Sequence, residues 1–389
     1  VAPMFTLMIA FGDIFGLGGS SVISRLLGEK KDNEAKKTCA FCIWVSLVFG
    51  ICISLILLVF KAPILELLGV TKATYEYSNA YYTWIAIGAV SIIFSMVPSN
   101  ILRTEGLAVQ SMAGSIIGSI VNIIFDPIFI FGLNQGAAGA AMATILGNII
   151  ADIYYVYAVI KKSKRLTCSP SHMKITGRRV KDILMIGIPA SITNIMQTFM
   201  MVMTNNFLLP YGTDKVAAMG IALKVNMITA LVLVGFAFGG QPLVGYNYGA
   251  QNKKRLKKIL KFANLFEMGL GLLFTIIMCI FAPQIIKVFM DKPDIITNGA
   301  MMLRCQQIGM TFMSVTLIST CVCQAVGNAG GAFVLSISRQ GVIYVLALLV
   351  MSNIFGYTGV LISQACSDVV TALIAISIML KIMKKIGNH

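Results

Sequence analysis

Long apolar runs separated by short polar segments follow one another along the whole chain. Each run has about 20 residues, the length that an α-helix needs to cross the hydrocarbon core of a bilayer. The runs are too long for barrel strands, so only helices can satisfy their backbone polar groups in lipid. The pattern predicts about eleven spans, at roughly 1–27, 38–60, 80–102, 109–132, 136–160, 181–208, 217–247, 259–281, 299–325, 332–354 and 358–382.

The composition agrees with an all-α membrane protein. Of the 389 residues, 57% are hydrophobic and only 12% are charged, and the mean hydropathy is +0.85. Soluble globular domains carry about 25% charged residues. The composition therefore excludes an ordinary soluble domain.

Basic residues are concentrated on alternate loops between the apolar runs, and the net charge is +16. By the positive-inside rule these loops face the cytoplasm. This accounts for the charge without a nucleic acid partner and predicts a multi-pass membrane protein. The basic loops contain Arg25, Lys30, Lys31, Lys36, Lys37, Arg103, Lys161 to Lys181, Lys253 to Lys261, Arg339, Lys381, Lys384 and Lys385.

The second half of the chain repeats motifs of the first at an offset of 220 or 221 residues. The corresponding positions are 18–28 and 239–249, Ala62-Pro63 and Ala282-Pro283, Gly106 and Gly327, and Gly139 and Gly359. Duplicated apolar halves are typical of secondary transporters, which bind their substrate between the repeats. We expect an amino-terminal lobe at 1–165, a cytoplasmic linker at 166–180 and a carboxy-terminal lobe at 181–389.

The repeat also bears on how the chain begins. Position 1 aligns with position 222, near the start of the second span of the second half. The span at 181–208 has no counterpart in the first half. We therefore expect one further helix ahead of Val1, and about twelve spans in two six-helix lobes in the complete protein.

Histidine and cysteine offer no reactive centre. His172 and His389 lie in a loop and at the terminus, and the nine cysteines are scattered, mostly within apolar runs. The close pairs Cys39/Cys42 and Cys321/Cys323 have neither a partner pair nor a nearby histidine. They therefore suit neither zinc nor redox chemistry, and buried small side chains are the better interpretation. We expect no catalytic residues, no resident cofactor and no enzymatic activity.

Acidic residues inside predicted spans are the candidates for function. Burying a carboxylate in a membrane helix is energetically unfavourable, so such residues usually have a functional role. They are Asp13, Asp126, Asp152, Glu267 and Asp368. Asp13 either lines a cavity or pairs across helices. Asp152 suits a structural or water-facing role. Glu267 and Asp368 face either a lobe core or a cavity.

Asp126 is the strongest candidate. Asn122 precedes it by one helical turn, so both side chains project from one face. Pro127 cannot donate to the carbonyl of Ile123, which frees that oxygen and can bend the helix. A carboxylate, an amide and a free carbonyl could hold Na⁺ or a proton. The alternative is a structural aspartate tied to a neighbouring helix.

Four motifs together resemble the multidrug and toxic compound extrusion (MATE) family. They are GGSSVISRLLG at 18–28, NIIFDPIFI at 122–130, GAAGAAMAT at 136–144 and QPLVGYNYG at 241–249. The resemblance covers essentially the whole chain and is greatest to the DinF/MepA-like prokaryotic branch. It implies a transporter of a bacterial or archaeal plasma membrane that exports organic cations against inward Na⁺ or H⁺.

The resemblance also implies a cation site in the amino-terminal lobe. Asn122 and Asp126 match the family's fifth-helix residues, and Thr144 and Ala140 match those of the sixth helix. If the coupling ion is sodium, Asp126, Asn122 and Thr144 would be its ligands. The family's first-helix aspartate cannot be assigned here.

The second half departs from the NorM-like branch, which has a glutamate where this chain has Gln197, eight residues after Pro189. The span at 299–325 has no acid, whereas NorM-like members have an aspartate there. Both departures favour the site at Asp126. Asp13, Asn194, Gln197 and Glu267 are further candidates for lining a cavity.

The sequence therefore predicts a monomeric multidrug antiporter whose partners are membrane lipid and small organic cations. One alternative is a flippase for a lipid-linked precursor, which would need a cationic lumen. Only Lys224 and Arg304 are counted as basic residues inside spans, which disfavours it. Another alternative is an exporter of one specific metabolite.

Overall fold

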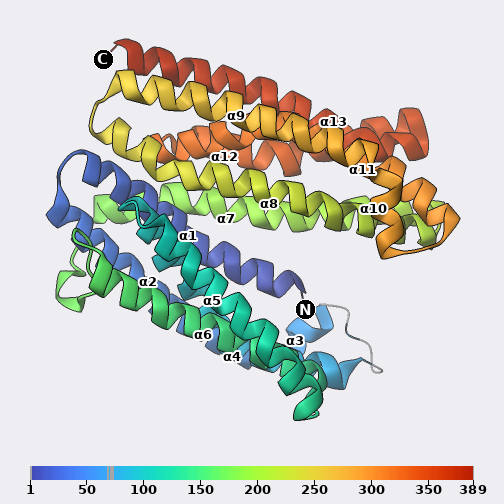
Figure 1. The fold of residues 1–389 in the computed structure, drawn as a ribbon, viewed down its shortest axis with the longest axis horizontal. Helices are drawn as coiled ribbons and strands as arrows, with labels where there is room; N and C mark the ends of the chain where they lie inside the picture. The colour runs from blue at the N-terminus through green and yellow to red at the C-terminus, as the bar shows by residue number, and fades with distance from the viewer. Residues whose placement is uncertain (1, 68–69, 71–73, 389) are drawn as a thin grey trace. The chain divides into compact units, whose positions relative to one another are not determined.

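The computed structural model describes residues 2–67, 70 and 74–388, and every regular element in this part of the chain is helical (Figure 1). The α-helices are α1 (Ala2–Gly28), α2 (Asp32–Val59), α3 (Lys61–Leu67), α4 (Tyr75–Thr104), α5 (Ala108–Pro127), α6 (Gly136–Lys162), α7 (Gly177–Leu208), α8 (Thr213–Gly249), α9 (Lys253–Ile280), α10 (Ala282–Phe289), α11 (Pro293–Val326), α12 (Ala329–Ile337) and α13 (Ile343–Asn388). Two π-helical segments, η1 (Ile128–Gly132) and η4 (Ser338–Val342), and two 3₁₀ turns, η2 (Pro170–His172) and η3 (Leu209–Tyr211), complete the elements.

Ten of these helical stretches are long and apolar enough to cross a bilayer. The last runs from Ala329 to Lys385, but it cannot be one straight helix. The Ser367 hydroxyl donates to the Arg339 carbonyl at 2.7 Å, whereas residues 28 apart in a straight helix are about 42 Å apart. Gly356, at φ 55° and ψ −126°, is where the helix breaks. The stretch therefore contains two crossings, and the eleven predicted spans are confirmed.

The predicted repeat recurs in the helix boundaries. Helix α2 covers 32–59 and α9 covers 253–280, and α1 and α8 end at 28 and 249, so each boundary recurs 221 residues later. The short helices α3 and α10 follow α2 and α9 in the same way. Gly106 and Gly327, with φ of 83° and 80°, end α4 and α11 in the left-handed conformation that glycine adopts without strain.

Contacts divide the chain into two compact units, residues 1–194 and 195–389. The division lies inside α7 rather than in the predicted linker, because the first part of α7 packs on α1. Gly187 lies so close to the Ile14 carbonyl that a side chain has no room there. The linker is also held within the first unit, since the Trp44 indole donates to the Cys168 carbonyl at 2.9 Å.

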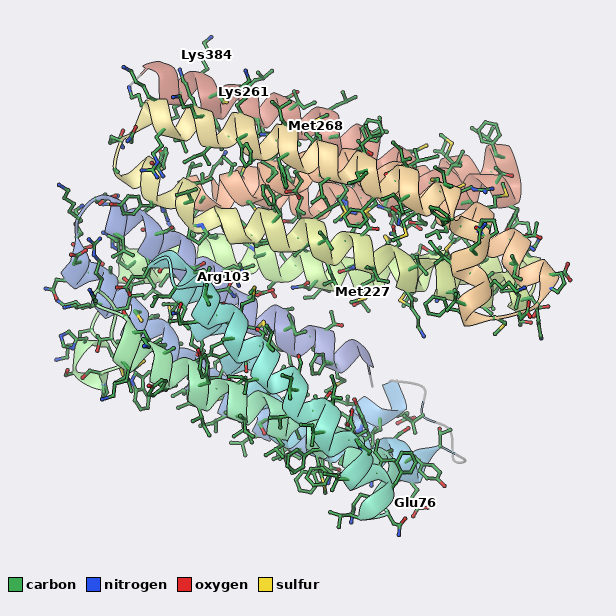
Figure 2. The ribbon with its side chains drawn as sticks, in the orientation of Figure 1. Glu76, Arg103, Met227, Lys261, Met268 and Lys384 are labelled. Carbon is green, nitrogen blue, oxygen red and sulfur yellow. The ribbon has the colours of Figure 1, made fainter. Side chains whose placement is uncertain are left out.

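Each unit has one central helix. In their most apolar windows, 72% of α4 and 78% of α11 is buried, against 6% for the span of α5 and 11% for α9. Helices α4 and α11 therefore form the cores, and α5 and α9 present wide apolar faces to lipid. Figure 2 shows Glu76 and Arg103 at opposite ends of α4, as the predicted charge asymmetry requires.

Candidate functional site

Close packing of α5 on α6 brings the predicted cation-site residues together. A Cβ atom on Gly118 would lie 2.9 Å from the Gly147 carbonyl oxygen, so the two backbones approach closely only because both residues are glycine. One turn further along α5, Asn122 faces α6. The two glycines therefore set the spacing at which side chains of the two helices can meet.

The Asn122 amide lies between Asp126 and Thr144. Its Nδ2 is 3.4 Å from Asp126 Oδ1 on the same helix and 3.4 Å from Thr144 Oγ1 on α6. All three side chains are partly buried. The expectation that Asn122 and Asp126 share a helix face agrees with this geometry. The third member comes from a helix 22 residues later in the chain.

The backbone of α6 orients the threonine. Thr144 Oγ1 donates to the Ala140 carbonyl at 2.9 Å, and Asn148 Nδ2 donates to the Thr144 carbonyl at 2.8 Å. Because the hydroxyl hydrogen is used, the lone pairs of Thr144 Oγ1 face away from its own helix. This explains the place of Ala140 in the motif, where only its carbonyl takes part.

The donor set suits a hard monovalent cation or a proton. Carboxylate, hydroxyl and amide oxygens are the ligands that such ions prefer. Rotating the Asn122 amide would turn its oxygen toward the other two groups in place of its nitrogen. Transition metals fit poorly: among the described residues no three His, Cys, Asp or Glu side chains converge.

The helix changes its hydrogen bonding at Pro127, as the sequence predicts. Helix α5 ends there, and the π-helical segment η1 follows, with Leu133 N–H donating to the Ile128 carbonyl at 2.9 Å. The start of α6 packs on this segment, since a Cβ on Gly139 would lie 2.6 Å from the Phe129 carbonyl carbon. The residue after Asp126 therefore begins an irregular turn that α6 supports.

The four candidates for lining a cavity have different surroundings. Asn194 Nδ2 donates to Asp13 Oδ2 at 2.9 Å, so these two form a pair between α7 and α1. Gln197, three residues further along α7, is exposed. Glu267 is fully buried in the second unit, and neither carboxylate oxygen has a hydrogen-bond partner in the described structure. Their part in a cavity stays a prediction.

Asp152 is held by two serines that sequence reasoning did not identify. The hydroxyls of Ser91 and Ser95 on α4 each donate to one of its carboxylate oxygens, both at 2.5 Å. Serines at i and i+4 on a helix face the same neighbour, which is the signal that could have found them. This arrangement favours the structural role for Asp152.

Arg339 corrects one expectation. The sequence pattern predicts a cytoplasmic loop at this residue, but Arg339 lies in η4 within a span, where its side chain is only 14% exposed. Its Nε is 2.8 Å from Asp368 Oδ1, and Gln364 Nε2 donates to the same oxygen at 3.1 Å. A single basic residue in an apolar run is expected to be paired, because an unpaired buried charge is costly.

Comparison with known proteins finds one family whose model matches most of the chain. The family model described as MatE matches residues 1–128 and 189–350, well over half of the chain. The multidrug export protein MepA of Staphylococcus haemolyticus is 30% identical over 387 residues, covering 99% of this chain and 84% of the relative. MepA of Staphylococcus saprophyticus is 29% identical, with 97% and 83% covered.

Solved structures share the same fold. An outward-facing multidrug resistance MATE transporter of the MOP superfamily superposes with a TM-score of 0.94 at 24% identity, covering 99% of this chain and 86% of that one. A MATE protein in complex with MaL6 also gives 0.94 at 24% identity, with 100% and 88% covered. At 24% identity, the similarity shows only that the folds are alike.

Proposed function

Because the chain belongs to the MatE family of multidrug and toxic compound extrusion transporters, we propose that it exports organic cations across the plasma membrane in exchange for Na⁺ or H⁺. Relatives named as multidrug export proteins match nearly its whole length and support efflux as the activity. We expect a monomer with no resident cofactor, in which the coupling ion is cargo.

One observation carries the coupling part of the proposal: Asp126, Asn122 and Thr144 meet on facing sides of α5 and α6. When Asp126 is charged, the Asn122 amide donates to it. A proton or Na⁺ arriving at Asp126 would remove the need for that donor. Thr144 and the amide oxygen would then complete the shell of a sodium ion.

The irregular turn after Asp126 gives the cation a way to act on the helix. Pro127 lacks the N–H that would hold the carbonyl of Ile123, so α5 bends at lower cost here than elsewhere. We infer that neutralising Asp126 changes this bend and weakens binding of the exported cation. Such coupling requires that the two ligands prefer different states of the same element.

The test is ethidium transport into inverted vesicles that contain the protein expressed from its complete gene, with the sodium and pH gradients imposed separately. In this orientation, efflux is measured as uptake into the vesicles. Asp126→Asn should abolish gradient-driven efflux while the protein still reaches the membrane. Glu76→Gln, which removes an exposed carboxylate of the same unit, should leave efflux unchanged. Undiminished efflux by Asp126→Asn would remove this residue from the mechanism, and rescue of a flippase-deficient strain would support the flippase instead.

A further inference from the structure

A pocket with both polar and apolar lining opens at one end of the second unit, where α8, α9, α11 and α13 end or begin. Its lining includes Asn247, Gln251, Lys253, Val326, Asn328 and Lys385. Its volume is about 410 Å³, many times the roughly 30 Å³ that one water molecule occupies in the liquid. The positive-inside rule assigns this end to the cytoplasm.

The pocket is strongly cationic. Lys253 and Lys385 line it, and neither takes part in an ion pair in the described structure. The sequence has no acidic residue between Asp214 and Glu267 and none after Asp368, so no carboxylate from these segments can balance the charge. Helix α9 also begins at Lys253, which adds the positive end of its dipole.

In the first unit, a glutamate carboxylate occupies the corresponding place. Glu105 ends the turn after α4, and its carboxylate accepts the backbone N–H groups of Lys164 and Arg165, each at 2.8 Å. The hydroxyl of Ser163 donates to the same carboxylate. A negative group is therefore tied to the segment that follows α6.

The repeat shows that this anion is missing from the second unit. At the offset of 221 shown by Gly106 and Gly327, Glu105 corresponds to Val326, and at the offset of 220 shown by Gly139 and Gly359, Arg165 corresponds to Lys385. The charge at the first residue of a second pair of corresponding helices is also reversed. Helix α2 begins with the acidic Asp32, whereas α9 begins with the basic Lys253. At these positions the second unit therefore has a lysine in place of Asp32 and lacks the carboxylate of Glu105.

Topology alone does not account for this arrangement. Orientation in the membrane needs only basic residues near the ends of the spans, and the exposed lysines 254, 257, 258 and 261 already supply them. Figure 2 shows Lys261 and Lys384 projecting from the outside of the second unit. Lys253, by contrast, is partly buried beside the fully buried Leu256, and Lys385, although exposed, lines the same hollow.

We propose that this pocket binds a phosphate-bearing anion, which supplies the negative charge that Glu105 supplies in the first unit. The anion is either the headgroup of an anionic phospholipid in the inner leaflet or a free phosphate compound. Both sources present the same chemistry to Lys253 and Lys385, as basic pockets between membrane helices do for lipid headgroups.

The experiment measures phosphatidylglycerol bound to the purified full-length protein in detergent by native mass spectrometry. Lys253→Gln combined with Lys385→Gln should weaken binding about tenfold or more. Val326→Glu should weaken it comparably, because the new carboxylate would occupy the site as Glu105 does in the first unit. This variant keeps every lysine.

Two matched controls separate the site from general charge. Lys257→Gln with Lys258→Gln removes the same charge outside the pocket, and Val326→Gln changes the same side chain without adding charge. Both should stay within about twofold of the parent. Equal loss in a control, or unchanged binding in Val326→Glu with the parent fold retained by gel filtration, overturns the proposal.

Competition identifies the source of the anion. Inorganic phosphate at millimolar concentration that displaces phosphatidylglycerol supports a site for free phosphate compounds. Lipid binding that resists phosphate but is not reproduced by phosphatidylcholine supports an anionic lipid headgroup. Equal binding of phosphatidylcholine and phosphatidylglycerol contradicts both.

Discussion

Asn194 on α7 donates a 2.9 Å hydrogen bond to Asp13 on α1, two positions 181 residues apart. The bond lies at the far end of the segment in which α7 packs on α1, beyond the close approach of Gly187 to Ile14. The division between the two units falls just after Asn194. Of the two roles open for Asp13, the structure shows pairing across helices.

Removing this donor should destabilise the first unit. In Asn194→Ala, the partly buried Asp13 Oδ2 loses this hydrogen-bond donor. The loss should lower the free energy of unfolding by about 1–3 kcal/mol. Thermal unfolding in detergent should show a lower midpoint. Thr193→Ala is the control, because Thr193 donates only to the carbonyl of Pro189 on its own helix. Equal midpoints for the two variants would show that the hydrogen bond contributes nothing.

Gly187 should not tolerate a side chain. Its ideal Cβ would collide with the Ile14 backbone carbonyl, which cannot move aside as a flexible side chain can. Gly187→Ala should therefore cost at least about 1–3 kcal/mol, as overpacking does. Gly235→Ala is the control, since Gly235 is also helical and has open space around it. Gly235→Ala should be neutral or stabilising by up to about 1 kcal/mol. The yield of folded protein after solubilisation is the measurement that compares the two variants.

Thr144 should matter through its hydroxyl. If Thr144 Oγ1 is a ligand, Thr144→Val keeps the shape of the side chain and removes the oxygen, so the concentration of driving cation needed for half-maximal efflux should rise about tenfold. Thr144→Ser keeps the oxygen and should stay near the parent. Similar loss in both variants would point to packing between α5 and α6 instead.

Asp152 and Asp126 should respond differently to the same substitution. In Asp152→Asn the amide can still bond both Ser91 and Ser95, since a hydroxyl accepts as well as donates. We expect drug resistance to persist in this variant and to disappear in Asp126→Asn. Loss of resistance in both, with normal amounts in the membrane, would give Asp152 a part in transport.

Cys168 in the linker should react slowly at neutral pH. Burial raises the pKa of its thiol to about 11, against about 8.5 for a free cysteine. The thiolate fraction therefore keeps rising about tenfold per pH unit up to pH 10, so alkylation should accelerate roughly a hundredfold from pH 8 to pH 10. Iodoacetamide labelling of a variant with Cys168 as its single cysteine measures this, and the rate in the denatured protein should level off near pH 9.

The local spacing of residues was enough to predict the spans and two of the three residues of the candidate cation site. Asn122 and Asp126 share a face because they are one turn apart on a helix, which holds wherever the helix lies. Pro127 disturbs the helix for an equally local reason. Thr144 entered only through resemblance to a family, because its distance to Asn122 depends on how closely α5 and α6 pack.

Contacts between helices could not be predicted from spacing. The sequence pattern leaves several roles open for Asp152 and predicts a loop at Arg339. In the structure, Asp152 is bound by a serine on another helix, and Arg339 is bound by Asp368 in the following span. An arginine in an apolar run satisfies the pattern of a loop residue and that of a buried ion-pair partner alike. Which one it is depends on whether Asp368 folds back to meet it.

The sequence by itself determined the membrane class, the number of crossings, the duplication and the family, because these depend on hydrophobicity, helix length and motif spacing along one chain. The tertiary structure alone decided which buried polar groups are partnered: Asp13 with Asn194, Asp152 with two serines, and Asp368 with Arg339. It also decided that two lysines far apart in the chain share a pocket. The physical reason is that hydrogen bonds and ion pairs act only over a few ångströms, and packing of separate helices sets those distances.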